Sequence, residues 1–416
     1  MARAMAALRP RDSLLAERDY PLFWLSRFAA NLGVQVESVA IGWQIYALAR
    51  RSMDVDHAAF LVGMVGLASF APLFLLALPA GVAADRYDRK AILRFCYAAE
   101  IVVVAGLAII SQLRLANAPL ILLAAVLFGA SRAFWAPANT ALGPMLVSRE
   151  QLARSIAWNS LAGQAGSILG PALGGLLVSL SPALAYWTSG ALYLFAAAAT
   201  LLIRRSGRPA VRSAISLAMV REGLTYVWTN KIVFGAISLD LFAVLLGGAT
   251  AMLPVMARDV LHVGASGFGV LRSAVAIGAA SVAIYLARRP IRQNAGAIMF
   301  AGVAVFALAT IAFGLSRSMP LSVAALVVIG GSDMLSVFVR GTLVQLVTPD
   351  AMRGRVAAVA TLFVSASNEL GEFRGGTVAR FVGPIATLVG GGIGALIVTG
   401  LWAKLFPALR KADRLA

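Results

Sequence analysis

Charged residues are scarce in this chain. Only 13% of its 416 residues are charged, while 60% are hydrophobic. Soluble domains contain roughly one quarter charged residues and about one half apolar residues. The composition therefore excludes an ordinary water-soluble domain, and it indicates that most of the chain lies in a membrane.

Cysteine and histidine are almost absent. The single cysteine, Cys96, stands in an apolar run, and the two histidines, His57 and His262, lack partners at the spacing of metal ligands. A disulfide framework and a zinc site are therefore not expected. The chain also lacks a phosphate-binding glycine loop and a nucleophile elbow. We expect no metal, no cofactor, no enzymatic activity and no ATP hydrolysis.

Acidic residues are half as frequent as basic ones, which gives a formal net charge of +18. Such a balance can indicate nucleic-acid binding when the basic residues form one patch or arm. Here they lie in short segments between apolar blocks, as the positive-inside rule of membrane topology requires. We therefore expect membrane lipids, and no nucleic acid, as partners.

Apolar blocks of about 20 residues, the length of a helix that crosses a bilayer, recur along the chain. The alternating pattern of a membrane barrel is absent. The sequence predicts an all-α membrane protein with twelve transmembrane helices arranged as two six-helix bundles. The predicted spans are 21–48, 58–80, 91–113, 120–145, 156–180, 183–203, 232–256, 268–287, 295–315, 321–346, 356–381 and 385–406.

An even number of spans places both termini on the same side of the membrane, and the distribution of basic residues indicates that this side is the cytoplasm. We expect a cytoplasmic N-terminal segment without a cleaved signal peptide, two bundles joined by a connector that carries an amphipathic helix, and a cytoplasmic tail. These parts span residues 1–20, 21–203, 204–231, 232–406 and 407–416. The only basic residues on the predicted extracytoplasmic side are Arg50, Arg51, Arg114, Arg258, Arg317 and Arg380.

The loop after the second predicted span reads Gly-Val-Ala-Ala-Asp-Arg-Tyr-Asp-Arg-Lys over residues 81–90. It resembles the Gly-x-x-x-Asp-Arg-x-Gly-Arg-Lys/Arg signature of the major facilitator superfamily. Asp88 stands where that family has glycine, although Asp tolerates the left-handed conformation of a turn. The resemblance implies a cytoplasmic gating motif that comprises Gly81, Asp85, Arg86, Arg89 and Lys90.

Residues 166–175 read Gly-Ser-Ile-Leu-Gly-Pro-Ala-Leu-Gly-Gly. They are similar to the antiporter motif Gly-x-x-x-Gly-Pro-x-x-Gly-Gly, which the same superfamily uses in exporters. Small residues let neighbouring helices approach closely and proline kinks a helix, so simple tight packing is the alternative. The motif residues are Gly166, Gly170, Pro171, Gly174 and Gly175.

Three further segments, 239–257, 348–356 and 367–376, resemble a bacterial branch of siderophore and drug efflux proteins within this superfamily. The segments lie in the second half of the chain, and the gating and antiporter-like motifs lie in the first. The resemblance implies a monomeric, multi-pass protein of the bacterial inner membrane with a small-molecule substrate.

Ionisable residues inside the predicted spans are the strongest functional candidates, because a charge in hydrocarbon is costly. By resemblance to the superfamily, Arg132 occupies the place of a basic residue linked to proton coupling, and the first helix of each bundle lines the cavity. A structural ion pair is the alternative for each charge. The proton-coupling candidates are Glu37, Arg132, Asp240, Glu100, Asp333, Glu369 and Glu372.

Large or charged side chains near these positions suit a substrate cavity, although packing is the alternative for each aromatic residue. Arg27 and Glu37 stand ten residues apart on one predicted helix, about 15 Å along its axis. They cannot bridge, so each needs another partner. The cavity candidates are Arg27, Trp43, Trp135, Phe242 and Arg340.

The sequence favours export of a siderophore or a hydrophobic drug-like compound by alternating access, in exchange for protons. A proton symporter for uptake is one alternative, which the antiporter-like motif argues against. A non-transporting membrane sensor or scaffold on the same fold is the other. The number of intramembrane charges disfavours it.

Overall fold

The computed structural model describes residues 18–148, 150–208, 217–289, 291 and 293–412. Within these ranges every regular element is a helix, so the predicted all-α class is confirmed. Most of the predicted N-terminal segment, residues 209–216 of the connector and the last four residues of the tail lie outside the described residues.

The first half of the chain forms long helices with short connections. They are α2 (Asp19–Ala49), α3 (Val55–Arg86), α4 (Arg89–Gln112), α5 (Ala118–Leu142), η3 (Gly143–Leu146), α6 (Leu152–Leu180) and α7 (Pro182–Leu202).

In the second half, α8 (Leu217–Thr229) lies in the connector. The remaining elements are α9 (Lys231–Gly247), η4 (Thr250–Met252), α10 (Leu253–Val255), η5 (Met256–Val260), α11 (Gly264–Arg288), α12 (Ala295–Leu315), α13 (Met319–Val347), α14 (Asp350–Val382), α15 (Pro384–Leu405) and α16 (Pro407–Arg410).

Ten helical segments of the described chain are long and apolar enough to cross a membrane. α2 and α14 are not among them, although they are 31 and 33 residues long. Both helices carry several charged residues along their length, which lowers their apolar character. Their membrane crossing, the count of twelve and the cytoplasmic termini stay predictions.

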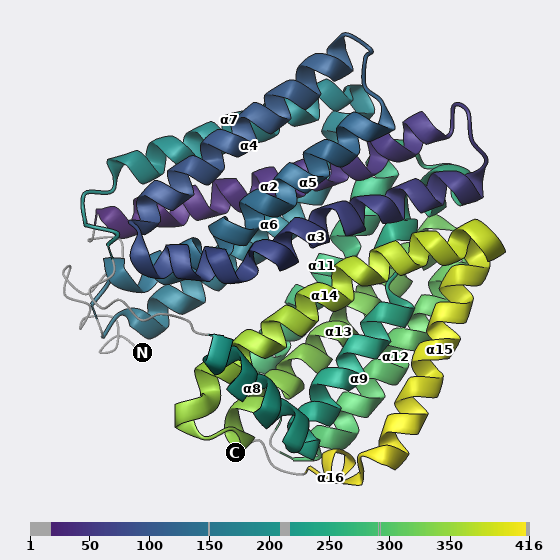
Figure 1. Cartoon of the computed structure of the whole chain (residues 1–416). Helices are drawn as coiled ribbons and strands as arrows, with labels where there is room; N and C mark the ends of the chain where they lie inside the picture. The colour runs from purple at the N-terminus through teal and green to yellow at the C-terminus, as the bar shows by residue number, and fades with distance from the viewer. Residues whose placement is uncertain (1–17, 149, 209–216, 290, 292, 413–416) are drawn as a thin grey trace, which may run out of the picture. The chain divides into compact units, whose positions relative to one another are not determined.

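The chain divides into two compact units. Unit 1 comprises residues 1–40, 71–116 and 123–214. In this unit α4 lies along α7, and α6 also contacts α7 (Figure 1). Buried hydroxyls join the helices, since Ser26 Oγ donates to the Ala196 carbonyl at 2.9 Å and Ser189 Oγ donates to the Gly33 carbonyl at 3.1 Å. α2 is thereby fixed to α7.

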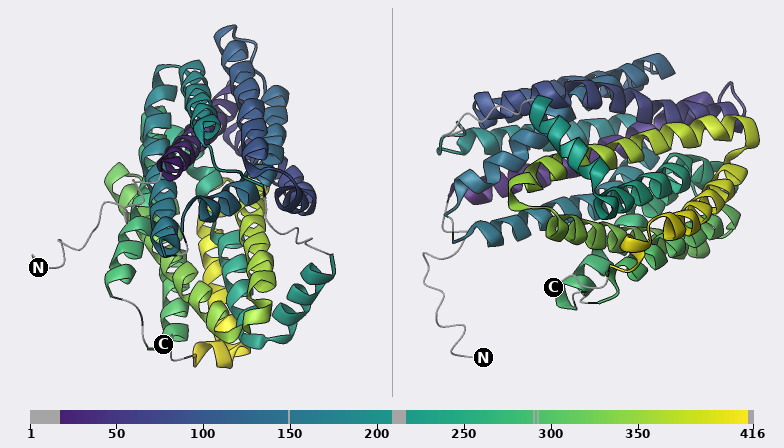
Figure 2. Two further views of the ribbon diagram at one scale, coloured as in Figure 1. Left: turned by 90° about the vertical axis from the view of Figure 1, so that its left-hand side faces the viewer. Right: turned by 60° about the horizontal axis from the view of Figure 1, so that its bottom comes forward.

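Unit 2 comprises residues 41–70, 117–122 and 215–416. Within it α12 packs against α13 and α15, and α9 packs against α14 and α15. Figure 2 draws these helices in green to yellow. The C-terminal end of α2 and the first half of α3 belong to this unit. The first residues of α5 (118–122) belong to it as well, so the boundary between the units falls within three helices, α2, α3 and α5, that the predicted bundle 21–203 keeps whole. The predicted bundle boundaries stay a prediction.

The predicted span 232–256 is interrupted, and its helical segments continue to Val260. α9 ends at Gly247, where Gly248 adopts an extended conformation with φ −59° and ψ 119°. Glycine is unfavourable within a helix, so two in succession promote this break. The Arg374 Nη2 atom donates to the Leu246 carbonyl at 2.5 Å. Arg374 thus satisfies an acceptor that the broken helix leaves exposed.

Candidate functional site

A cluster of charges lies in the interior of unit 1. Glu37 on α2 is fully buried, and Glu100 on α4 is 5% exposed. The two carboxylates act on each other electrostatically, and both also feel Arg132 on α5. The Tyr193 hydroxyl donates to Glu37 Oε2 at 2.7 Å. The structure therefore brings three predicted coupling residues together.

This cluster holds more acidic than basic groups. Ser131 hydrogen-bonds Glu100, but Glu37 Oε1 and Glu100 Oε2 are buried without a hydrogen-bond partner in the described part of the chain. Two ionised carboxylates beside one guanidinium leave one net negative charge, which is costly away from water. One added proton would neutralise that charge. The cluster can therefore bind and release a proton.

The glycines of the antiporter-like motif position α2 in this unit. A Cβ added at Gly170 would lie 2.4 Å from Gln35 Cβ, and one at Gly174 would lie 3.0 Å from Val39 Cβ. Only glycine permits α6 to approach α2 so closely. The motif therefore supports the helix that carries Glu37.

Unit 2 contains a second buried charge pair. Asp240 on α9 forms an ion pair with Arg340 on α13, and their side chains are 6% and 8% exposed. The sequence assigned these residues to different roles, coupling and cavity, but the structure places them in contact. Asp333 lies on the same helix as Arg340, seven residues earlier.

Glu369 and Glu372 lie elsewhere in unit 2, where α14 crosses the first half of α3. A Cβ added at Gly66 would lie 2.9 Å from both Glu372 Cβ and the Glu369 carbonyl oxygen, and one at Gly63 would lie 2.8 Å from the Gly376 Cα. These two residues therefore border a very close helix crossing.

The five predicted cavity residues are divided between the two units. In unit 1, Arg27 Nε is buried without a hydrogen-bond partner among the described residues, and the groups that act on its charge are the phenols of Tyr20 and Tyr97. Trp135 Nε1 donates to the Tyr97 hydroxyl at 3.2 Å. Arg27 and Trp135 thus lie around one phenol.

In unit 2 the predicted cavity aromatics pack against other rings. Trp43 stacks on Phe268 with ring centroids 6.0 Å apart, and Phe242 lies 5.2 Å from Trp402. These contacts agree with the packing alternative, and the cavity role of both residues stays a prediction.

The gating motif joins the ends of several helices in unit 1. Gly81, Asp85 and Arg86 form the last turns of α3, and Arg89 begins α4. The Arg89 side chain donates to the carbonyls of Ala84 and Ala141 at 3.1 and 3.2 Å, which ties this turn to α5.

Asp88 caps α4 through an oxygen that accepts the Lys90 amide at 2.9 Å. Its φ of −64° and ψ of 115° are ordinary for an N-cap residue. The interpretation of Asp88 as a left-handed turn residue is therefore wrong.

Asp19 secures the start of α2 nearby. Its carboxylate accepts the backbone amides of Arg204 and Arg205 at 3.1 and 2.8 Å. Burial opposes ionisation, but these amides and the charges of Arg205 and Lys90 hold the pKa of Asp19 below its ordinary value.

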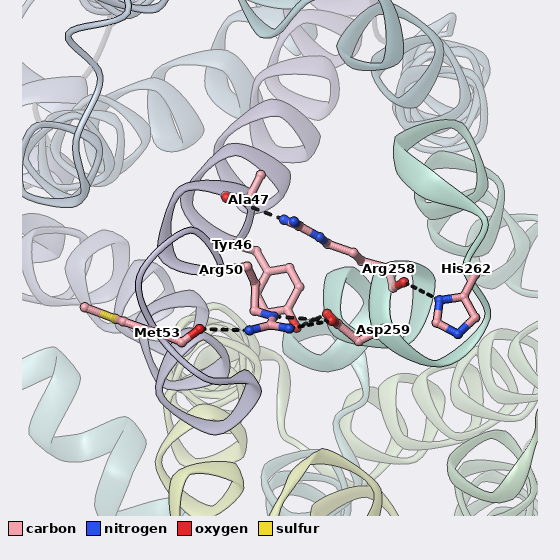
Figure 3. A network of polar contacts seen from close by, with 7 residues as sticks. All are labelled: Tyr46, Ala47, Arg50, Met53, Arg258, Asp259 and His262. Carbon is pink, nitrogen blue, oxygen red and sulfur yellow. Dashed lines mark hydrogen bonds and ion pairs between the residues drawn. The ribbon is translucent and has the colours of Figure 1, made fainter.

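The sequence did not predict a polar network in unit 2 between the end of α2 and η5 (Figure 3). Arg50 Nε and Nη2 donate to Asp259 Oδ1 at 3.2 and 3.0 Å, and the Tyr46 hydroxyl hydrogen-bonds Asp259 Oδ2. Arg50 Nη1 also donates to the Met53 carbonyl at 2.8 Å. The sequence offered only one signal, which was two basic residues, Arg50 and Arg258, on the sparsely charged side.

The chain matches a known protein family. Residues 13–416 match the family described as transmembrane secretion effector. The enterobactin exporters EntS of Shigella boydii serotype 4 (strain Sb227) and Citrobacter koseri are each 26% identical over 408 residues, which covers 95% of this chain and 94% of each relative.

Solved transporters share the fold. The transporter PepTSo has a TM-score of 0.74 at 13% identity, with 95% of this chain and 99% of that chain covered. A bacterial homologue of the lysosomal transporter Spinster has a TM-score of 0.72 at 15% identity, with coverage of 95% and 98%. The chain is therefore a multi-pass membrane transporter of the bacterial inner membrane, and it belongs to the transmembrane secretion effector family of the major facilitator superfamily.

Proposed function

We propose that this protein exports a small molecule across the inner membrane in exchange for protons. The observation that carries the proposal is the cluster of Glu37, Glu100 and Arg132, where two buried carboxylates face one arginine. In that cluster a single proton decides between one net negative charge and none. When the cluster takes up a proton, its net negative charge disappears, and with it the free-energy cost of keeping that charge away from water. When the proton is released to the cytoplasm, the negative charge returns.

The substrate we propose is a siderophore or a hydrophobic drug-like compound, and two observations support this choice. The relatives at 26% identity are enterobactin exporters. In addition, among the described residues the groups that act on the charge of Arg27 are the phenols of Tyr97 and Tyr20. An anionic group on the substrate would compensate this arginine.

The proposal is tested in two steps. Metabolite profiles of the medium and the cells from a deletion strain and its complemented counterpart identify the compound that stops leaving the cell. Purified protein is then reconstituted into proteoliposomes, and transport of that compound is measured under an imposed pH gradient of either direction. An exporter that exchanges substrate for protons should move the compound in the direction opposite to the proton flow. A symporter would move it in the same direction as the protons.

Three variants locate the coupling. Glu37→Gln and Glu100→Gln remove one titrating group each and should abolish pH-driven accumulation while substrate exchange continues. Glu150→Gln, which changes an exposed carboxylate outside the predicted spans, is the control and should accumulate substrate at the wild-type rate. Wild-type, pH-driven accumulation by both cluster variants would show that the coupling charge lies elsewhere.

A further inference from the structure

The contacts of Asp259 join two elements that are far apart in the sequence. Its carboxylate receives Arg50 on Oδ1 and Tyr46 on Oδ2, so both oxygens are occupied by donors from the end of α2 (Figure 3). Tyr46 and Arg50 are four residues apart, which places them on one helix face. The ion pair is partly buried, with 24% of the Arg50 side chain and 19% of the Asp259 side chain exposed. Such a pair is screened less than a surface pair.

Asp259 lies in a stretch of unusual backbone geometry. Asp259 lies on η5, a π-helical turn in which the Leu261 amide donates to the Met256 carbonyl at 2.8 Å. π-helical turns are rare and occur frequently at functional sites. His262 follows with a φ of 54°, in the left-handed region that non-glycine residues seldom adopt. The chain therefore keeps two unfavourable local conformations at the point where Asp259 meets its partners.

The contact also joins the ends of two helical segments that each carry a buried carboxylate. α2 contains Glu37 as well as Tyr46, and the segment that ends in Asp259 begins with α9, which contains Asp240. The helix break at Gly247 and Gly248 separates Asp240 from Asp259. The segment that bears Asp259 is thus not a rigid continuation of α9.

We propose that Asp259 is a positioning residue that latches the end of α2 to the last turn of the seventh span, on the predicted extracytoplasmic side. The latch breaks once in each transport cycle so that substrate can leave on that side. This second statement rests on the proposed function, whereas the latch itself rests only on the contacts of Asp259 with Tyr46 and Arg50.

The chain offers a matched control for the latch. On the same predicted side, His57 Nδ1 lies 2.7 Å from Asp54 Oδ1 in a hydrogen-bonded pair whose side chains are 50% and 65% exposed. Both residues lie at the start of α3, so their pair joins no separate elements. Asp54→Asn removes a carboxylate of the same chemistry whose hydrogen bonds, in the described part of the chain, go to His57 and not to the latch residues.

The test measures labelling of single cysteines by a membrane-impermeant maleimide on intact cells, in a background that carries Cys96→Ala. Ala49→Cys reports on the latch, because Ala49 is only 4% exposed and lies one turn from Tyr46. Met53→Cys is the control reporter, since Met53 is 44% exposed. Met53→Cys should be labelled in every variant, and its protection in intact cells would overturn the extracytoplasmic location of the latch.

We expect Asp259→Asn and Arg50→Gln to increase the labelling rate of Ala49→Cys several-fold, and Asp54→Asn to leave it unchanged. The charge swap Arg50→Asp/Asp259→Arg should return the rate toward that of the unmodified latch. Tyr46→Phe removes one hydroxyl with little risk to folding, and it should give a smaller increase. Equal labelling rates in the unmodified, Asp259→Asn and Tyr46→Phe proteins would overturn the proposal, as would a charge swap that behaves like the single variants.

Labelling requires neither substrate nor a proton gradient, so it separates the latch from the proposed function. If the latch variants respond as expected but the protein shows no pH-driven transport, only the proposal of proton-coupled export is contradicted, and the latch stands. Under conditions where the wild type transports, Asp259→Asn should lower accumulation. Unchanged accumulation would overturn the role of the latch in the cycle.

Discussion

Asp240 and Arg340 form a buried ion pair. Removing either charge alone should therefore destabilise the folded protein. Asp240→Asn would leave the Arg340 charge buried and uncompensated, which costs about 3–5 kcal/mol in comparable pairs. The double variant Asp240→Asn/Arg340→Gln removes both charges and should recover most of that loss. Thermal unfolding of the detergent-solubilised protein measures both effects. An equal loss in the single and double variants would contradict a direct pair.

The residues of the charge cluster differ from this pair in their balance of charge. Asp240 forms an ion pair with Arg340, whereas Glu37 and Glu100 both interact with Arg132. A balanced pair is satisfied without a proton, and an unbalanced cluster is not. For this reason we propose that proton coupling lies in the cluster in unit 1, and the coupling role predicted for Asp240 stays a prediction.

At the level of helices, the contact between α2 and α6 depends on glycine at defined positions. Gly170→Ala would place a Cβ 2.4 Å from Gln35 Cβ, which cannot move away without its helix. We expect a loss of about 1–3 kcal/mol, the usual effect of overpacking. Gly163→Ala on the same helix is the control, because a Cβ there meets no atom within 4 Å. It should be neutral or stabilising by up to about 1 kcal/mol, since alanine favours helix.

Both glycine variants are compared with the wild type by thermal unfolding in the same detergent. A difference in melting temperature between Gly170→Ala and Gly163→Ala tests the helix contact itself rather than a general effect of a methyl group. If both variants melt together, α6 does not approach α2 at Gly170.

For the whole molecule, the decisive prediction concerns topology. Reporter fusions after Arg94 should be cytoplasmic, and those after Met53, Asn117 and Ser318 should be extracytoplasmic, because basic residues concentrate on one predicted side. Alkaline phosphatase and a fluorescent protein give opposite signals on the two sides. A mixed pattern among the three extracytoplasmic fusions would defeat the twelve-span topology, including the crossing of α2 and α14.

The sequence by itself determined the class of this protein. Apolar blocks of about 20 residues need no tertiary contact to be recognised, because lipid forces each block into a helix whatever its neighbours are. The residues 81–90 and 166–175 likewise carry the superfamily resemblance in a local pattern. The same local rules identified Glu37, Glu100 and Arg132 as costly charges within apolar runs.

Only the tertiary structure decided which of these charges meet. Three coupling candidates lie 37, 100 and 132 residues along the chain, and no local rule selects them from the seven proposed. Asp259 and Arg50 were still harder to recognise, because each looks like an ordinary charge at the end of a span. Their contact depends on a π-helical turn and joins residues that stand 209 positions apart in the chain. Such long-range pairing is set by packing, which the order of residues along one segment does not contain.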